Sequence, residues 1–217
     1  MNKVLSFPID MVKVGWPTLV LINGRFDEVS SFLSEFYRDD CARGRVELKY
    51  LPCLVDPADI HFYLGEADLN VLAPSLGNAA QTLLWTSGPG IQNIFLTRLS
   101  WRLGISSIAM QKCADWKSPN AASMLMVMGG RGKVDRIVRV MRDDTGRLDF
   151  YSDGALQPFE NSEHYKSKFK KCRMNSEIID EYWRKLNVDV DRETSEWTGR
   201  PGVVFFPRKR ALWPTQP

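Results

Sequence analysis

Basic and aromatic side chains alternate in one short segment, which carries the strongest local chemical signal in the chain. Five cations and two aromatic rings fall within this basic aromatic segment, residues 165–173: Tyr165, Lys166, Lys168, Phe169, Lys170, Lys171 and Arg173. Spaced cations can follow a phosphate backbone while aromatic rings stack on bases. The same residues suit an acidic protein surface. A solvated approach to the next helix is the commonest meaning of such a charge run, and of the two binding interpretations the protein partner is favoured.

Further positive charge lies outside this segment, on Arg136, Arg139 and Arg142 and in the cluster Arg208-Lys209-Arg210. The linear sequence does not determine whether these groups converge with the basic aromatic segment in space. Both binding interpretations therefore stay open on charge alone.

Two glycine clusters lack the spacing of nucleotide-binding loops. A Walker loop needs a glycine five positions before a Gly-Lys pair and Ser or Thr directly after it. Before Gly132-Lys133 that position is Val127, and the residue after the pair is Val134. The cluster Gly88-Pro89-Gly90 lacks the third glycine of a dinucleotide fingerprint and follows a helical pattern. Both clusters predict turns, and no cofactor is expected.

Histidines and cysteines show no recognisable catalytic or zinc-binding pattern. The chain has two histidines, His61 and His164, and neither has a partner motif for a catalytic triad. The four cysteines are widely scattered without a CxxC pair: Cys41, Cys53, Cys113 and Cys172. They are expected to be free or buried thiols. A Cys-His nucleophilic pair that is assembled in space stays open as an alternative.

Three acidic clusters are the other candidates for metal binding, since hard cations prefer several oxygen ligands. They are Asp39-Asp40, Asp143-Asp144 and Asp189-Val190-Asp191. None has the loop spacing of an EF-hand or its glycine at the bend, so turn and helix-end positions are predicted instead. The sequence thus predicts no catalytic, cofactor-binding or metal-binding residue.

The composition describes a globular chain whose net charge says little about its partner. Of 217 residues, 44% are hydrophobic and 11% are aromatic, which is enough apolar surface for a sizeable core. The net charge of +3 is too small to identify a nucleic-acid binder. Residues 1–10 contain no sustained apolar stretch, and no run approaches the roughly 18 apolar residues of a membrane span. A cytoplasmic protein without a membrane partner is expected.

The first half of the chain alternates strand and helix patterns. The apolar run Thr18 to Ile22 predicts a buried strand, and apolar residues at three- and four-residue spacing from Phe26 to Phe36 predict a helix. This helix should end before Gly44. Strands are expected at Val46 to Tyr50, which would be half-buried, and at Ile60 to Leu64.

Two helices separated by the turn sequence Ser87-Gly88-Pro89-Gly90 are predicted for the middle of the chain. Asn78 is placed to cap a short first helix that reaches Trp85. Gly104 is placed to end the second helix. The apolar face of that second helix consists of Ile91, Ile94, Phe95, Leu99 and Leu103.

After residue 104 the pattern changes to that of a sheet. Short turns separate three strand-like stretches, which predict an antiparallel meander: Ser123 to Met128, Val134 to Arg142 and Leu148 to Tyr151. A closing helix is expected from Ser176 to Leu186, where Glu181 and Lys185 can pair across one turn. The run Val203 to Phe206 is predicted as an edge strand.

These elements predict a single α+β domain over residues 1–217, with a mostly antiparallel sheet and flanking helices. A subdivision near residue 104 is the alternative. It would separate an N-terminal α/β part from a C-terminal meander plus helix.

The stretch from Gly146 to Trp183 resembles the layout of small cytosolic immunity proteins of bacterial polymorphic toxin systems. A strand ends in the pair Phe150-Tyr151, a turn leads to Leu156-Gln157-Pro158-Phe159-Glu160, and the basic aromatic segment introduces a helix with acidic and aromatic residues. The resemblance covers about a fifth of the chain. It implies a protein that binds and blocks a cognate toxin domain without catalytic residues, and it transfers no functional residue position by position.

The function predicted from the sequence is therefore a non-enzymatic protein-binding module, an immunity protein that neutralises a cognate bacterial toxin domain. Abundant Trp, Tyr, Phe and Arg residues suit a protein interface, and the charge balance favours an acidic or mixed toxin surface. The basic aromatic segment supplies the predicted partner-binding residues. The alternative is a nucleic-acid-associated protein or an enzyme that uses the same residues, 165–173.

Overall fold

One antiparallel sheet of nine strands runs through the part of the chain that the computed structural model describes, residues 18–52, 70–86, 91–113, 115–119, 121–196 and 199–207. The strands are β1 (Thr18–Ile22), β2 (Val46–Leu51), β3 (Asn70–Pro74), β4 (Thr82–Thr86), β5 (Ser107–Gln111), β6 (Ala122–Met128), β7 (Val134–Arg142), β8 (Leu148–Gly154) and β9 (Gly202–Pro207). Their order in space is β2-β9-β3-β4-β1-β5-β6-β7-β8. The predicted α+β class with a mostly antiparallel sheet is confirmed.

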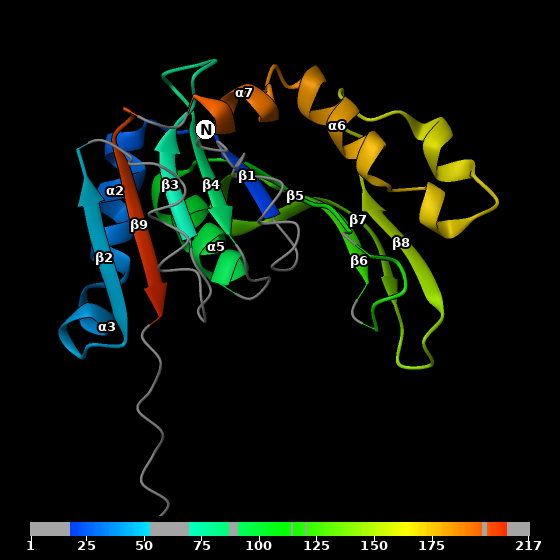
Figure 1. Ribbon diagram of the computed structural model, residues 1–217, viewed down its shortest axis with the longest axis horizontal. Coiled ribbons are helices and arrows are strands. Elements are labelled where there is room, and N and C mark those ends of the chain that lie inside the picture. The colour runs from blue at the N-terminus through cyan, green and yellow to red at the C-terminus, as the bar shows by residue number, and fades with distance from the viewer. Residues whose placement is uncertain are drawn as a thin grey trace, which may run out of the picture.

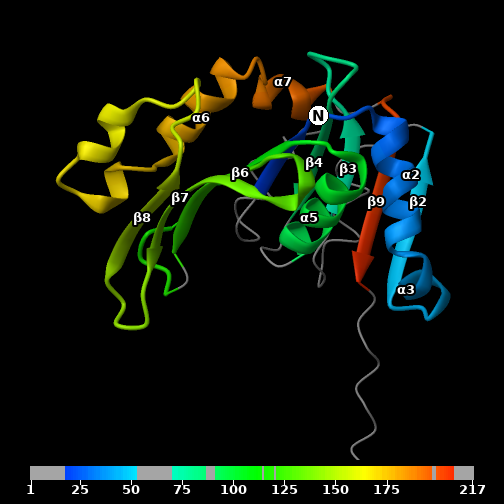
Figure 2. The same cartoon turned by 180° about the vertical axis from the view of Figure 1, so that it is seen from behind.

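Helices flank this sheet on both faces. The α-helices are α2 (Phe26–Phe36), α3 (Arg38–Ala42), α5 (Ile91–Leu103), α6 (Ser176–Lys185) and α7 (Val190–Ser195). Short 3₁₀ helices are η1 (Gly130–Gly132), η2 (Ser162–Lys166) and η3 (Lys170–Cys172). Helices α2 and α5 lie on the side that faces the viewer in Figure 2, and α6 and α7 lie along the upper side of the sheet in Figure 1. Within the described residues, no helix has the length and apolar character needed to cross a membrane.

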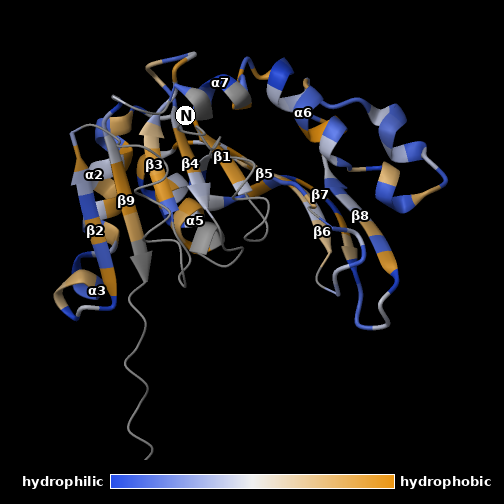
Figure 3. Cartoon of the chain, in the orientation of Figure 1, coloured by the Kyte–Doolittle hydropathy of each residue, from blue (hydrophilic) through white to orange (hydrophobic). Residues whose placement is uncertain are grey.

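The alternation of side chains along the strands divides the buried residues into two cores. One core joins α2 and α5 to the sheet and contains Val20, Val29, Leu33, Leu84, Phe95 and Leu99. The other joins α6 to the opposite face and contains Leu21, Trp85, Leu125, Ile179, Tyr182 and Trp183. Because the central strands are buried on both faces, β1, β3 and β9 are mainly hydrophobic along their length (Figure 3).

Most elements with clear periodicity occur where the sequence predicts them. Strand β1 and helix α2 have the expected bounds, and the meander β6-β7-β8 consists of consecutive antiparallel neighbours. Helix α6 is capped by Asn175, whose side chain accepts a hydrogen bond from the Ile178 amide at 3.0 Å. Glu181 and Lys185 form the expected pair at 2.7 Å.

The helix predicted between Asn78 and Trp85 is wrong, because Thr82–Thr86 forms strand β4. All five residues of this strand are buried, so the stretch has no polar side that could face solvent on a surface helix. Asn78 instead accepts a hydrogen bond from the Ala80 amide at 3.0 Å, within the turn that precedes β4. Strands β3 and β5 were not predicted, and the strand predicted at Ile60 to Leu64 lies outside the described residues.

Strand β9 was predicted at an edge, and this is also wrong. It lies between β2 and β3 and pairs with both. Val204 belongs to one core, whereas Val203 and Phe205 belong to the other. A continuous apolar run is expected for a strand that is covered on both faces.

The sheet continues across residue 104. Strand β1 lies between β4, which precedes this residue, and β5, which follows it. Gly104 itself has a φ of +67° and ends α5, as the sequence predicts.

A buried ion pair attaches α7 to the turn after β3. The side chains of Arg200 and Glu193 are 9% and 3% exposed, and their Nη2 and Oε2 atoms are 2.9 Å apart. The second oxygen of Glu193 accepts hydrogen bonds from Ser75 Oγ at 2.9 Å and from the Leu76 amide at 2.8 Å. The turn and α7 are therefore held together by a satisfied buried charge.

Candidate partner-binding surface

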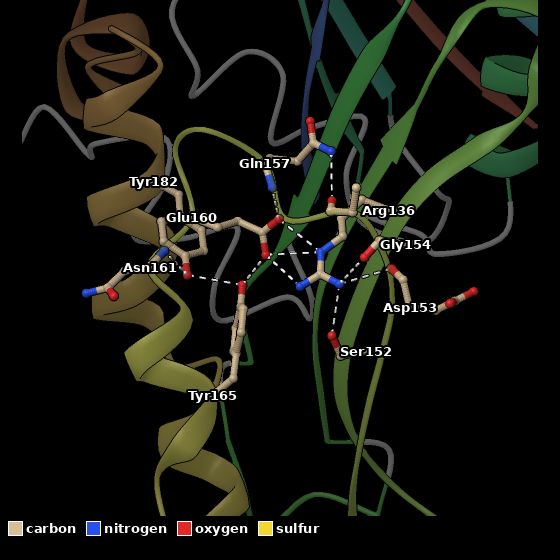
Figure 4. A network of polar contacts seen from close by, with 10 residues as sticks. Arg136, Ser152, Asp153, Gly154, Gln157, Glu160, Asn161, Tyr165 and Tyr182 are labelled. Atoms are coloured by element: carbon tan, nitrogen blue, oxygen red, sulfur yellow. Dashed lines mark hydrogen bonds and ion pairs between the residues drawn. The ribbon is translucent and has the colours of Figure 1, made fainter.

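A buried ion pair between Arg136 on β7 and Glu160 in the loop after β8 supports the region that contains the basic aromatic segment (Figure 4). The two side chains are 4% and 0% exposed, and Arg136 Nη2 lies 2.9 Å from Glu160 Oε2. The other side of the guanidinium donates from Nη1 to Ser152 Oγ at 2.9 Å and to the Gly154 carbonyl at 3.0 Å. Both charges are thus hydrogen-bonded, which offsets much of the cost of removing them from water.

Tyr165 extends this network toward α6. Its hydroxyl donates to Glu160 Oε2 and accepts from the Tyr182 hydroxyl at 3.1 Å. Burial raises the pKa of Tyr165 strongly, and the hydrogen bond to Glu160 raises it further, so the phenol remains a protonated donor at neutral pH. Tyr165 therefore anchors the basic aromatic segment to the protein interior.

Two lysines of the segment form exposed ion pairs. Lys166 Nζ lies 2.6 Å from Glu163 Oε1, and Lys170 Nζ lies 3.1 Å from Asp149 Oδ1 at the start of β8. The hydrogen bond from Lys170 lowers the pKa of Asp149. These pairs are solvated and contribute little to stability, but the second one links η3 to the edge strand.

Arg173 packs inward at the end of the segment. Its Nε donates to the Ser167 carbonyl at 2.8 Å, and its guanidinium lies 4.8 Å from the centre of the Phe150 ring. Phe150 also packs against Tyr165, with ring centres 5.8 Å apart. Arg173 and Tyr165 therefore hold the two ends of the segment on the same side chain of β8.

The remaining three predicted residues point outward and are called the Phe169 surface: Lys168, Phe169 and Lys171. Phe169 is 64% exposed, and its carbonyl accepts the Cys172 amide at 2.9 Å in the turn of η3. Lys168 and Lys171 are exposed, and neither has an ion-pair partner within the described ranges. The structure thus separates the segment into residues that fix it and residues that face solvent.

The additional arginines do not join this surface. Arg136 is buried, and Arg142 Nε donates to the Ser118 carbonyl at 3.0 Å. Arg139 alternates with the buried residues Val138 and Val140, so it lies on the opposite face of the sheet. The cluster Arg208-Lys209-Arg210 falls outside the described residues.

The histidines and cysteines within the described residues lie in surroundings that do not activate them for catalysis. His164 Nε2 is 2.9 Å from Glu181 Oε2, so it is paired rather than free in solvent. Cys41, Cys113 and Cys172 are free, and burial raises the pKa of the Cys113 thiol, which keeps it protonated. His61 and Cys53 lie outside the described residues. In the described ranges, no group of three or more His, Cys, Asp or Glu residues could hold a metal ion.

A pocket of about 410 Å³ opens beside the C-terminal half of α6. Its rim includes Lys112, which follows β5 and forms an ion pair with Asp180. Trp183 and Val188 supply its apolar side, and Arg184 and Asp189 add charges of opposite sign. The pocket therefore offers no excess of one charge and no activated nucleophile.

Comparison of the chain with protein-family models, with curated proteins and with solved structures gives no match.

One feature of the sequence indicates that Arg136 is buried. Arg136 has the same strand parity as Val138 and Val140, which places it on the core face of the predicted strand. A buried arginine needs a carboxylate, and Glu160 follows Phe159, a buried aromatic residue. The alternation of side chains along this strand therefore predicts that Arg136 is buried and does not belong to a surface patch.

Proposed function

We propose that the chain is a non-enzymatic protein-binding module, an immunity protein that blocks a cognate bacterial toxin domain through the Phe169 surface. The observation that carries the proposal is a 64%-exposed phenylalanine between two exposed lysines, Lys168 and Lys171. Aromatic residues dominate the binding energy of many protein interfaces. A large aromatic ring that is left in water therefore supports a partner that buries it.

The framework beneath this surface supports the same proposal. Tyr165 and Arg173 fix the two ends of the segment through the Glu160 carboxylate and the Phe150 ring. A segment that is already ordered loses less conformational entropy when it binds. The three outward residues are thus presented in advance rather than ordered by the partner.

The chemistry of the surface supports a partner of a particular kind. The ring of Phe169 requires an apolar depression, and the flanking lysines require carboxylates around it. Opposite charges at the rim of an interface raise the association rate and make it sensitive to salt. The expected partner is a toxin domain with an acidic rim around a small apolar depression.

An immunity gene is expected beside the gene of its toxin, and co-expression with the toxin domain of such a neighbour tests the proposal. The full chain should restore growth and co-purify with the toxin domain, and calorimetry should give its affinity. Phe169→Ala should weaken binding about 30-fold, the loss expected for a hot-spot residue. Tyr50→Ala is the control, because Tyr50 is 55% exposed on β2 at the other edge of the sheet.

Two results would count against this function. If the wild-type chain neither binds the toxin domain nor restores growth, the immunity function is wrong. If it binds but Phe169→Ala binds equally well, the function stands and the surface is wrong.

A charge-reversal pair separates the protein partner from nucleic acid. Lys168→Glu with Lys171→Glu should slow association with the toxin domain, whereas Arg38→Glu with Arg43→Glu makes the same charge change on exposed positions of the α3 region. An oligothymidine probe should pass over the wild-type chain at low salt without retention. Retention that only the lysine variant abolishes would favour the nucleic-acid alternative.

A further inference from the structure

A second exposed aromatic residue lies on α5, on the opposite face of the sheet from the Phe169 surface. Trp101 is 66% exposed, and Ile94, two helical turns earlier, is 64% exposed. The sequence predicts Ile94 and Leu103 on the inward face of this helix, but both are exposed, while Leu96 takes a buried position beside Phe95 and Leu99. The prediction of that apolar face is therefore wrong at two positions.

The turn between β6 and β7 is fastened to α5 beside Trp101. The buried hydroxyl of Ser100 donates to the Gly129 carbonyl and accepts from the Gly132 amide at 3.1 Å. Gly132 has a φ of +70°, and a Cβ atom there would lie 3.1 Å from the Thr97 carbonyl and 3.6 Å from Trp101 Cβ. The glycine lets the turn approach the helix this closely.

This attachment brings cations from two distant parts of the sequence together. Arg98 and Arg102 are exposed on α5, and Arg131 and Lys133 are exposed on either side of Gly132. In the described part of the chain, none of these four cations has an ion-pair partner. One carboxylate, that of Asp135, lies beside Gly129, so positive charge remains in excess. These residues form the Trp101 corner: Arg98, Trp101, Arg102, Arg131 and Lys133.

Backbone geometry adds to this picture at Arg131. It adopts a φ of +66°, a left-handed conformation that non-glycine residues rarely take. Such strained positions cluster at functional sites such as ligand clamps and switch regions. Arg131 adopts this conformation at the tip of the turn, and the hydrogen bonds of Ser100 fix the turn against α5.

We propose that the Trp101 corner is a second docking surface, which takes an acidic protein segment that also carries apolar side chains. The unpaired cations would bind carboxylates of the partner. Trp101 and Ile94, which lie two turns apart on one side of α5, and exposed Val134 in the attached turn region require apolar groups of the partner. A nucleic acid would satisfy the cations with phosphates, but it would leave the exposed aliphatic side chains in water. Aromatic and arginine side chains with apolar neighbours are the composition of protein interfaces.

This surface is independent of the Phe169 surface. Helix α5 packs into the core on one face of the sheet, and α6, which follows the basic aromatic segment, packs into the core on the other. The two helices lie apart in both views (Figures 1 and 2). The protein can therefore hold two partners at once, one on each face.

Three defined probes test the proposal on the full chain by calorimetry. They are an amphipathic peptide of glutamate and leucine, a peptide of equal length and charge with serine in place of leucine, and oligothymidine. The Glu-Leu peptide should bind at least tenfold more tightly than the other two. Trp101→Ala and the pair Arg98→Glu with Arg102→Glu should each weaken it at least tenfold, whereas Arg38→Glu with Arg43→Glu and Phe169→Ala should not.

Other outcomes overturn the proposal. Equal binding of the Glu-Leu and Glu-Ser peptides would remove the role of the apolar residues, and tighter binding of oligothymidine would assign the corner to nucleic acid. Concentration-dependent self-association that Trp101→Ala abolishes would assign it to a second copy of the chain. Absence of peptide binding would also refute it. Because the substituted side chains are exposed, circular dichroism should give a native fold for each variant, and growth rescue by the Trp101→Ala variant tests the Phe169 surface separately.

Discussion

Replacing Glu160 with glutamine should destabilise the protein by about 3–5 kcal/mol, the cost of leaving one member of a buried ion pair without its partner. Glutamine keeps the shape of the side chain but supplies one acceptor oxygen where the carboxylate supplies two. Glu160 accepts from Arg136 at 2.9 Å through both Nε and Nη2, and from the Gln157 amide at 2.8 Å. In the variant, the amide NH₂ group of glutamine is a donor and points at the donors of Arg136 or Gln157. The Arg136 charge also stays buried without a carboxylate.

Urea denaturation at pH 7 measures this loss, and a thermal melt should show a fall of roughly 6–20 °C at 2–4 °C per kcal/mol for a chain of this size. Arg136→Met combined with Glu160→Leu removes both charges. This double variant should be at least about 2 kcal/mol more stable than the sum of the single effects predicts, since no unpaired charge is left. Glu163→Gln, which affects only an exposed pair with Lys166, should be indistinguishable from wild type.

A loss below about 1 kcal/mol in the free energy of unfolding for Glu160→Gln would refute the buried ion pair, because removing the charge of a fully buried, paired carboxylate costs more than that. Additive effects of the two positions in the double variant would refute it as well. Either result would mean that Arg136 and Glu160 do not share a desolvated contact.

Three further predictions concern other parts of the network and the turns. Glu193→Gln should cost about 3–5 kcal/mol in urea denaturation because it leaves Arg200 buried without its carboxylate, and a cost near zero would contradict the buried pair. Gly132→Ala should lower stability by about 1–2 kcal/mol in a thermal melt, since alanine is strained at a φ of +70°, whereas Gly130→Ala, at a glycine without positive φ, should cost less. Tyr165 has a raised pKa, so its phenol ionises first in the unfolded chain, and its contribution to stability is present below about pH 10 and is lost as the pH rises. Tyr165→Phe should therefore give a shallower fall in stability above about pH 10, and an unchanged slope would show that the hydroxyl is not buried against Glu160.

Local periodicity was sufficient to predict several elements. Apolar residues alternate along β7 and recur at three- and four-residue spacing in α2, so each pattern places them on one side of its element. In both elements that side is buried, as the pattern predicts. The buried run in β4 has no such face, so its five residues fitted a helix as well as a strand. Periodicity determines an element only where one side of it meets water.

Local sequence patterns do not predict which distant segments lie side by side in space. The position of β9 between β2 and β3 depends on pairing across most of the chain. The candidate surface was predicted as one cluster of seven residues, but its anchor, Tyr165, and its exposed ring, Phe169, differ because of Glu160, a residue outside the segment. The Trp101 corner joins α5 to a turn through the hydrogen bond between the Ser100 hydroxyl and the Gly132 amide, 32 residues later. No spacing in the sequence indicates that contact.

The place of β9 in the sheet also determines when the protein can fold. Among the described strands, β2 pairs with β9 alone, and the paired residues are 151 to 161 positions apart in the sequence. During synthesis, β2 and the edge of β3 that pairs with β9 lack their hydrogen-bonding partner until residues 202–207 have left the ribosome. Such late, long-range closure slows folding and leaves strand edges open to other chains. Newly made protein should therefore depend on chaperones until β9 is inserted, and a chain that stops before Gly202 should aggregate rather than fold partially.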